Sequence, residues 1–304
     1  MARSRLWAAL LLLAIAGCRS AEPDGSPLIG VSLLNKQDVF YQDLEAGMEE
    51  AAAAAGARLL VQSAEKDLAA QTAQIENFVV RGVDAIIACP VDSRAVARAL
   101  QGAAEAGVAV FTADIAAEGV EVVGHIASDN VQGGRLAGEH LASLLGGEGA
   151  VAVVDHPEVT SVQDRVAGFL ESVEMHPGMQ LAARPSAQGR RDLALDVTTG
   201  LLQAHPEIRG IFAINDETAL GVLAALASLG RDDVAVVGYD AIPEARRAIR
   251  EGTPLRADVV QHPDEMGRMA VRAVLMHLRG EPVERNQPVP VSLVTREDLQ
   301  AGDR

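Results

Sequence analysis

Short apolar runs alternate with longer segments whose apolar residues recur every three or four positions along most of the chain. The runs are nearly continuous, which is typical of strands buried on both faces of a parallel sheet. In the first part of the chain they predict strands at residues 28–33, 58–61, 85–88, 109–111 and 122–126. The longer segments between the first four runs predict helices at about residues 38–55, 67–81 and 93–106.

The same alternation resumes after residues 122–134, the segment where we expect the chain to cross from a first lobe of the fold to a second. Ser128, Asp129 and Asn130 follow a predicted strand there and can cap a helix that begins near Val131. Further strands are predicted at residues 150–154, 179–183, 210–214 and 234–238, with helices near 161–175, 191–204, 216–229 and 242–250. Two runs of strand–helix units predict an α/β fold, with two doubly wound parallel-sheet lobes and a ligand cleft and hinge between them.

The end of the chain predicts one more strand at residues 256–261, a long helix at 263–279 and a final strand at 289–294. The long helix follows a second-lobe strand, so we expect the chain to return to the first lobe there. The expected N-terminal lobe comprises residues 28–128 plus 262–289, and the expected C-terminal lobe comprises residues 129–261 plus 290–304.

The first residues of the chain have the layout of a secretory signal. Arg3 and Arg5 precede an apolar run at residues 6–16, which is too short to span a bilayer as a mature helix. Removal of this segment makes the formal net charge of −16 two units more negative. A chain this acidic repels polyanions, which excludes nucleic acid as a partner.

Residues 15–18, Ile-Ala-Gly-Cys, resemble a bacterial lipobox, in which the cysteine thiol receives a diacylglyceryl group and the cysteine becomes the new N-terminus. This resemblance implies a lipoprotein signal peptide at residues 1–17, a lipidated Cys18 that attaches the protein to a membrane, and a tether at residues 18–27. The alternative is ordinary signal cleavage nearby with an incidental cysteine. Cys89 ends a strand that is predicted to be buried, so a disulfide between the two cysteines is not expected.

Signatures of catalysis and metal binding are absent from the sequence. It contains no nucleophile elbow, no P-loop, no H-E-x-x-H and no C-x-x-C motif. Its seven histidines lack the spacing of metal ligands. We therefore expect no enzyme activity, no cofactor and no metal site, which leaves binding as the function.

Polar side chains follow the predicted strands, at the edge of the sheet where ligands bind in open α/β folds. They are Asn35, Asp38, Asp114, Asn215 and Asp240, and the aromatic residues beside them are Phe40, Tyr41 and Tyr239. Directional hydrogen bonds to hydroxyl groups, together with aromatic faces over C–H surface, suit a sugar ring. Structural alternatives remain for each residue. Asp38 and Asp216 can be helix caps, Arg165 can be a solvated charge, and the aromatic residues can be core packing.

Over nearly all of residues 28–294, the sequence resembles the bacterial periplasmic ribose-binding proteins, which belong to the sugar-binding and repressor-effector family of type I periplasmic binding proteins. The motifs that carry the resemblance are residues 125–131 with Gly133-Gly134, 204–206, 215–217 with 219–221, 236–240, and Gln261 with Pro263-Asp264. The resemblance implies that aromatic side chains stack on a sugar and that polar side chains bind its hydroxyl groups. By this resemblance the stacking residues are Phe40, Tyr41 and Tyr239, and the polar residues are Asp114, Arg165, Asn215, Asp240 and Gln261.

The chain departs from the ribose-binding pattern at positions expected to contact the ligand. Leu34 replaces a serine, Asp38 an asparagine and Ile115 an arginine, and Gln188 or Gly189 stands where an aromatic residue is expected. Isoleucine offers no hydrogen-bond donor, and an ionised carboxylate only accepts. We therefore expect Asp38 and Ile115 to contact a monosaccharide or polyol other than ribose.

These observations predict a monomeric, extracytoplasmic solute-binding lipoprotein of the periplasm or cell envelope that delivers a monosaccharide-like ligand to an ABC permease. Contacts to both lobes are available together only when the hinge is closed, so ligand shifts an open–closed equilibrium. The main alternative is a sensor-coupled binding protein that presents a sugar or a furanosyl autoinducer to a receptor kinase or chemoreceptor. A repressor of the same fold would carry a helix-turn-helix where this chain has its signal segment.

Overall fold

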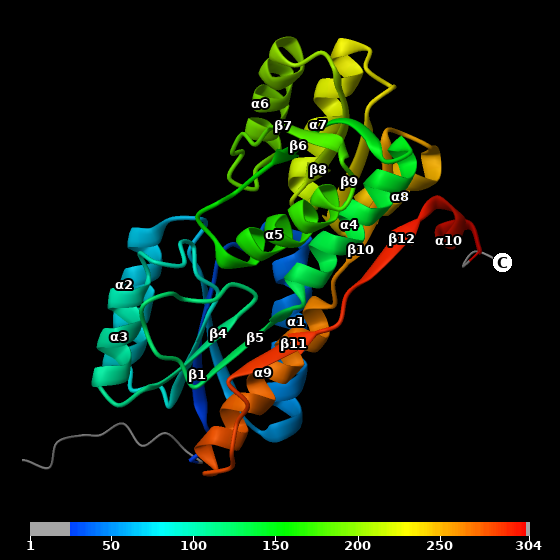
Figure 1. Ribbon diagram of the computed structural model, residues 1–304. Helices are drawn as coiled ribbons and strands as arrows, with labels where there is room; N and C mark the ends of the chain where they lie inside the picture. Colours follow the sequence, from blue (N-terminus) through cyan, green and yellow to red (C-terminus); the bar gives the residue numbers. More distant parts are fainter. Residues whose placement is uncertain (1–24, 302–304) are drawn as a thin grey trace, which may run out of the picture.

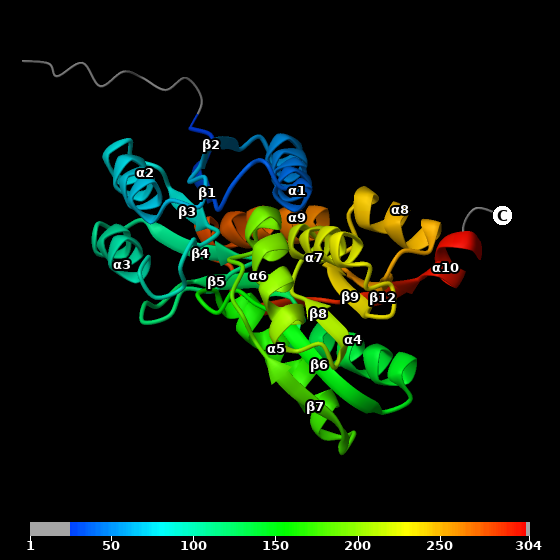
Figure 2. The same cartoon turned by 90° about the horizontal axis from the view of Figure 1, so that it is seen from above.

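The computed structural model describes residues 25–301 and shows two α/β lobes with three chain crossings between them (Figure 1). Each lobe has a six-stranded sheet with helices on both faces (Figure 2). The predicted signal peptide, Cys18 and most of the predicted tether lie outside the described residues. Within residues 25–301, no helix combines the length and the apolar content of a membrane span.

The first sheet takes strands from both ends of the described chain. Its order is β11-β5-β4-β3-β1-β2, and every neighbouring pair is parallel. The strands are β1 Leu28–Leu33, β2 Arg58–Ser63, β3 Ala85–Ala88, β4 Ala109–Ala113, β5 Gly124–Ser128 and β11 Asn286–Val289. Nearly every residue of β1, β3 and β4 is buried, which explains their continuous apolar runs.

Helices α1 and α9 cover one face of the first sheet, and α2 and α3 cover the other (Figure 2). Their bounds are α1 Val39–Ala55, α2 Leu68–Val80, α3 Ala97–Glu105 and α9 Pro263–Leu278. Glycines let α1 and α9 approach closely, since a Cβ atom on Gly47 would lie 2.0 Å from the Asp264 carbonyl oxygen. On the other helix, a Cβ atom on Gly267 would lie 2.2 Å from the Leu44 carbonyl oxygen. This backbone contact fixes α1, whose first turn carries the aromatic residues of the predicted site.

The second sheet repeats the architecture in the order β12-β10-β9-β8-β6-β7. Its strands are β6 Glu148–Val154, β7 Gly178–Ala183, β8 Ile208–Ala213, β9 Ala235–Asp240, β10 Leu255–Val260 and β12 Ser292–Thr295, of which only β12 is antiparallel to its neighbour. Helices α4 Asn130–Leu145 and α5 Thr160–Glu174 cover one face. The other face carries α6 Arg191–Ala204, α7 Asp216–Leu229 and α8 Pro243–Glu251, and α10 Arg296–Ala301 follows β12.

The chain crosses between the lobes at three places within the described residues. β5 leads into α4 through Asp129, β10 leads into α9 through residues 261–262, and β11 leads into β12 through residues 290–291. The Asp129 carboxylate accepts the Gln132 N–H at 3.0 Å, so Asp129 is the one of the three predicted capping residues that caps α4. The three crossings lie beside the region where the lobes meet (Figure 1).

Some elements differ from the sequence prediction. The single final strand predicted at residues 289–294 is wrong, because a crossing at residues 290–291 divides the segment and each half pairs with a different sheet. Helix α3 begins later than predicted, at Ala97, because Asp92 Oδ1 accepts two backbone N–H groups and holds a separate turn before it. The short helix α10 was not predicted.

Candidate functional site

A cavity lies between the lobes, at the carboxyl ends of strands from both sheets. Its first-lobe residues are Leu34, Asp38, Val39, Phe40, Tyr41, Lys66, Asp114 and Ile115. Its other residues are His156, Val159, Ser161, Val162, Arg165, Gln188, Gly189, Ile214, Asn215, Asp216, Glu217, Asp240 and Ile242 of the second lobe, with Gln261 at a crossing. Except for Tyr239, the residues predicted to contact the ligand all line this cavity. That these residues contact a ligand stays a prediction.

Phe40 and Tyr41 form the aromatic part of the wall, in the first turn of α1. Their rings pack edge to face, with centroids 5.1 Å apart and planes at 82°. The Tyr41 hydroxyl donates to Asp114 Oδ2 at 2.7 Å, which fixes the ring and occupies one oxygen of the carboxylate. Aromatic side chains held in this way can cover the C–H surface of a sugar.

Asp114 follows β4 with a φ of 64°, in the left-handed backbone region. Its side chain is buried, and its Oδ1 atom has no hydrogen-bond partner among the described residues. Burial raises the pKa of Asp114, whereas the charge of Arg165 and the hydrogen bond from Tyr41 oppose the increase. Asp114 therefore brings one unused acceptor to the cavity wall.

Arg165, on α5, is the buried cation of the second-lobe wall. Its Nε donates to Asn130 Oδ1 and its Nη1 donates to the Ile214 carbonyl oxygen, both at 2.8 Å. Nη1 also lies 3.8 Å from Asp240 Oδ1. A guanidinium fixed at several points is preorganised to bind oxygen atoms of a ligand.

Tyr239 lies behind Arg165 and does not line the cavity. Its ring is fully buried, and the guanidinium carbon of Arg165 lies 3.8 Å from the ring centroid. Its hydroxyl donates to Asn130 Oδ1 at 3.3 Å. Gly133 makes room for the ring, since a Cβ atom there would lie 2.1 Å from the Tyr239 hydroxyl oxygen. The structure contradicts the predicted stacking of Tyr239 on a ligand and gives it instead a cation–π contact that supports Arg165.

Asp240 and Gln261 adjoin each other in the wall near the second crossing. Gln261 Nε2 donates to Asp240 Oδ1 at 2.6 Å. This bond sets the orientation of the amide, because an ionised carboxylate oxygen can only accept. Gln261 Oε1 is buried and has no partner among the described residues. Burial raises the pKa of Asp240 well above its usual value, and the charge of Arg165 opposes the increase.

Asn215 caps a helix and also lines the cavity. Its Oδ1 accepts the Thr218 N–H at 3.0 Å and caps α7, a role that the sequence did not predict for this residue. Gly189 approaches the other side of the amide, since a Cβ atom there would lie 3.2 Å from Asn215 Nδ2. Gln188 and Gly189 both line the cavity, so this loop reaches the site without an aromatic side chain.

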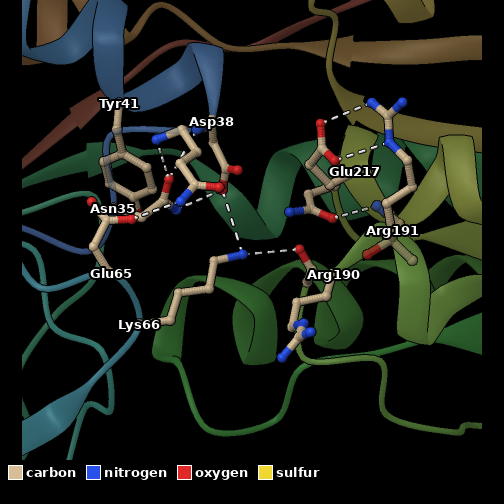
Figure 3. A network of polar contacts seen from close by, with 12 residues as sticks. Asn35, Asp38, Tyr41, Glu65, Lys66, Arg190, Arg191 and Glu217 are labelled. Atoms are coloured by element: carbon tan, nitrogen blue, oxygen red, sulfur yellow. Dashed lines mark hydrogen bonds and ion pairs between the residues drawn. The ribbon is translucent and has the colours of Figure 1, made fainter.

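Asp38 precedes α1 but does not cap it, which contradicts that part of the prediction. No helix N–H donates to its side chain, and its Oδ2 instead accepts from Asn35 Nδ2 at 2.7 Å. The same oxygen lies 3.6 Å from Lys66 Nζ, which also donates to the Gly189 carbonyl oxygen at 3.3 Å (Figure 3). The ion pair of Asp38 and Lys66 therefore lies within the first lobe, and Lys66 links it to the second lobe through the hydrogen bond to Gly189.

Several residues of the cavity were not predicted. Lys66 lies in the turn after β2 with a φ of 62°, and no strand-end or periodic pattern marks it in the sequence. His156 also lines the cavity, and burial lowers its pKa to about 4, so the ring is neutral at pH 7. Glu217 belongs to a motif quoted above, and it forms an ion pair with Arg191 at 3.0 Å (Figure 3).

A second set of contacts between the lobes surrounds Thr160. Its N–H donates to Ser93 Oγ, and its Oγ1 accepts the Ala116 N–H, both at 3.0 Å. The Ser93 N–H donates to the Glu158 carbonyl oxygen at 3.1 Å. Together with the bridge from Lys66, these hydrogen bonds hold the lobes against each other, and the structure therefore represents a closed arrangement.

Two buried carboxyl groups, those of Asp216 on α7 and Asp258 on β10, lie on either side of Gly238. A Cβ atom on Gly238 would lie 3.1 Å from Asp216 Oδ1 and 2.8 Å from Asp258 Oδ2. Burial raises the pKa of both groups, that of Asp258 to about 7, and their mutual repulsion raises that of Asp216 further. The pair therefore retains a proton near neutral pH. Among the described residues, no group of three or more His, Cys, Asp or Glu side chains is arranged to hold a metal ion.

Comparison with known proteins gives matches over both lobes. Residues 29–282 match the family model of the periplasmic binding protein domain. The chain is 36% identical to the ribose import binding protein of Escherichia coli over 294 residues, which cover 96% of this chain and 97% of that protein. An ABC transporter solute binding protein of Bacillus halodurans with bound myo-inositol has a TM-score of 0.84 at 32% identity, covering 93% of this chain and 99% of that one. A solute binding protein of Actinobacillus succinogenes with bound D-allose gives 0.83 at 29% identity, covering 91% and 100%. These relatives are solute-binding proteins rather than enzymes.

Proposed function

The chain belongs to the periplasmic binding proteins, among the sugar-binding proteins of ABC transporters, and we propose that it is a lipid-anchored protein that delivers a monosaccharide-like ligand to an ABC permease. Family membership places it outside the cytoplasm. The observation that supports the ligand class is the cavity itself, where aromatic rings and buried hydrogen-bonding groups from both lobes face one space.

Binding proceeds by closure of the lobes on the ligand. Tyr41 and Asp114 belong to the first lobe, whereas Arg165 and Asn215 belong to the second, so a ligand gains both sets of contacts only in the closed form. A permease can then distinguish closed from open protein by the surface that the two lobes form together. A role in presenting the ligand to a receptor kinase or chemoreceptor would use the same closed form, and the ribose import binding protein among the relatives favours import.

The side chains beside Asp114 favour a ligand other than ribose. Leu34 and Ile115, which replace a serine and an arginine of the ribose-binding pattern, are buried and line the cavity. Neither side chain can donate to a hydroxyl group, and an unpaired buried hydroxyl costs roughly 1–3 kcal/mol. This difference is large enough to change the order of affinities among similar pentoses, hexoses, deoxy sugars and polyols.

A binding screen of the Cys18→Ser chain tests the function. The panel comprises monosaccharides, polyols and their amino derivatives, and thermal unfolding is the measurement. We expect at least one compound to stabilise the chain, since a ligand at about 100 times its dissociation constant adds roughly 2.7 kcal/mol to the free energy of unfolding. Ribose should not be the tightest ligand. Failure of every compound to bind would reject the function, whereas tightest binding of ribose would reject only the argument from Leu34 and Ile115.

Membrane attachment is proposed to depend on Cys18. We expect the wild-type chain to incorporate labelled lipid and to sediment with membranes, and Cys18→Ser to lose the label and become soluble. Cys89→Ser is the matched control, because Cys89 is fully buried and should not affect labelling. Wild-type chain without lipid, or a Cys18→Ser variant that still carries it, would contradict the anchor.

A further inference from the structure

Two carboxyl groups of the cavity wall, those of Asp114 and Asp216, have no cation of their own, and that of Asp216 lies beside Gly238 and Asp258. Arg165 Nη1 lies 3.8 Å from Asp240, and Lys66 Nζ lies 3.6 Å from Asp38, so each of these cations has a carboxylate partner. Among the described residues, no Lys, Arg or His nitrogen lies within ion-pairing distance of Asp114. Arg165 acts on the Asp114 carboxylate only from farther away.

The unpartnered polar atoms of this wall are acceptors. Asp114 and Gln261 are each 5% exposed, and Asp114 Oδ1 and Gln261 Oε1 have no hydrogen-bond partner among the described residues. Gln261 Nε2 donates to Asp240, which leaves Oε1 as the unpaired acceptor of this amide. Buried acceptors of this kind are normally paired, and a ligand that brings donors to this wall would pair them.

The surroundings of Asp114 offer no further protein donor. Leu34 and Ile115 present aliphatic carbon, and the Tyr41 hydroxyl is already used on Asp114 Oδ2. Phe40 and Tyr41 add aromatic faces to the same cavity, and such faces attract cations. The part of the first-lobe wall beside Asp114 therefore combines a buried carboxylate, aromatic rings and aliphatic side chains, whereas Lys66 of the same wall is paired with Asp38.

We propose that the ligand is an amino sugar or an amino polyol whose protonated amine binds Asp114. This inference rests on the proposed function and specifies the ligand class of the same cavity. An ammonium group brings three donors and the charge that the buried carboxylate lacks, and charge-assisted hydrogen bonds are about twice as strong as neutral ones. A hydroxyl group in the same place brings one donor and leaves the carboxylate uncompensated. The remaining hydroxyl groups of the ligand bind Arg165, Asn215 and Asp240.

Titration calorimetry at mildly acidic pH tests the inference with matched pairs. The pairs are D-glucosamine with D-glucose, D-galactosamine with D-galactose, and D-glucamine with D-sorbitol, each against the Cys18→Ser chain. We expect the amine of at least one pair to bind roughly tenfold or more tightly than its neutral partner. In the same background, Asp114→Asn should weaken binding of the amine more than binding of its neutral partner, and should thereby remove this preference. Asp43→Asn, which neutralises an exposed carboxylate on α1, should keep the preference.

The outcomes separate the inference from the proposed function. Neutral compounds that bind as tightly as their amines would overturn the inference and leave the function intact. A preference that survives in Asp114→Asn, or an equal loss of both affinities in a variant whose thermal unfolding shows that it is folded, would also overturn it. Binding of none of the compounds would reject the inference and the function together.

Discussion

Replacement of Arg165 by alanine should weaken ligand binding at least about thirtyfold. The guanidinium forms two hydrogen bonds, to Asn130 and to the Ile214 carbonyl oxygen, and lies 3.8 Å from Asp240. Without it, Asp240 keeps its burial and loses the cation that favours its ionised form. Loss of one partner from a buried charge pair costs on the order of 2–5 kcal/mol, and the lower figure corresponds to about thirtyfold. Calorimetric titration with the ligand found by the screen measures the loss.

Two further variants show whether the effect belongs to the cavity. Arg135→Ala removes a half-exposed arginine of the same lobe whose carboxylate partner is Glu171, and affinity should stay within a few fold of wild type. Arg165→Lys keeps the charge but lacks the planar fork that reaches two acceptors, so an intermediate loss is expected. Wild-type affinity in Arg165→Ala would mean that the ligand binds elsewhere.

The pair of Asp216 and Asp258 should make a contribution to the free energy of unfolding that falls as the pH rises from about 4 to about 7. The folded pair retains a proton because burial raises the pKa of Asp258 to about 7 and that of Asp216 well above its usual value. In the unfolded chain the same groups release their protons near pH ~4, so the folded pair binds more protons in this window and its contribution decreases by a few kcal/mol. Burial lowers the pKa of His125 and His156 to about 4, and these groups contribute with the opposite sign, so the effect of the pair is measured as a difference between variant and wild type.

Asp258→Asn should remove this contribution, so that stability rises more, or falls less, with pH than it does in the wild-type chain. The asparagine amide can donate to the Asp216 carboxylate, so the folded pair no longer needs a shared proton. Urea unfolding at about pH 5 and about pH 8 gives the two stabilities for each chain. Asp196→Asn changes the same charge at an exposed position of α6 and should retain the wild-type slope. An unchanged slope in Asp258→Asn would exclude the pair as its source.

Local patterns predicted the cavity residues that follow strands. Asp114 directly follows β4, Asn215 comes two residues after β8, and Asp240 ends β9, so the rule that parallel strands end at one edge of a sheet predicted their positions. The position of Tyr239 was not predictable in this way. Its ring packs against Gly133 of α4 and beneath Arg165, and this contact joins segments far apart in the sequence.

Other parts of the site depend on contacts between distant segments. Lys66 lies near Asp38 because β1 and β2 pair in the first sheet, and it reaches Gly189 only because the lobes close on the turn after β2. Asp258 faces Asp216 only because β10 pairs with β9 in the register that places Asp258 beside Gly238. Sequence periodicity carries no information about either arrangement, since both follow from the pairing of elements far apart in the chain.

The position of β11 links the topology to the order in which the chain is made. This strand forms the edge of the first sheet beside β5, although the whole second lobe except β12 and α10 lies between them in sequence. Helix α9, which packs on α1, also comes after most of the second lobe. A chain that emerges from the ribosome N-terminus first therefore cannot complete its first lobe until nearly all of it has been synthesised. Pairing between such distant segments slows folding, so the first lobe should be the later of the two lobes to reach its final structure.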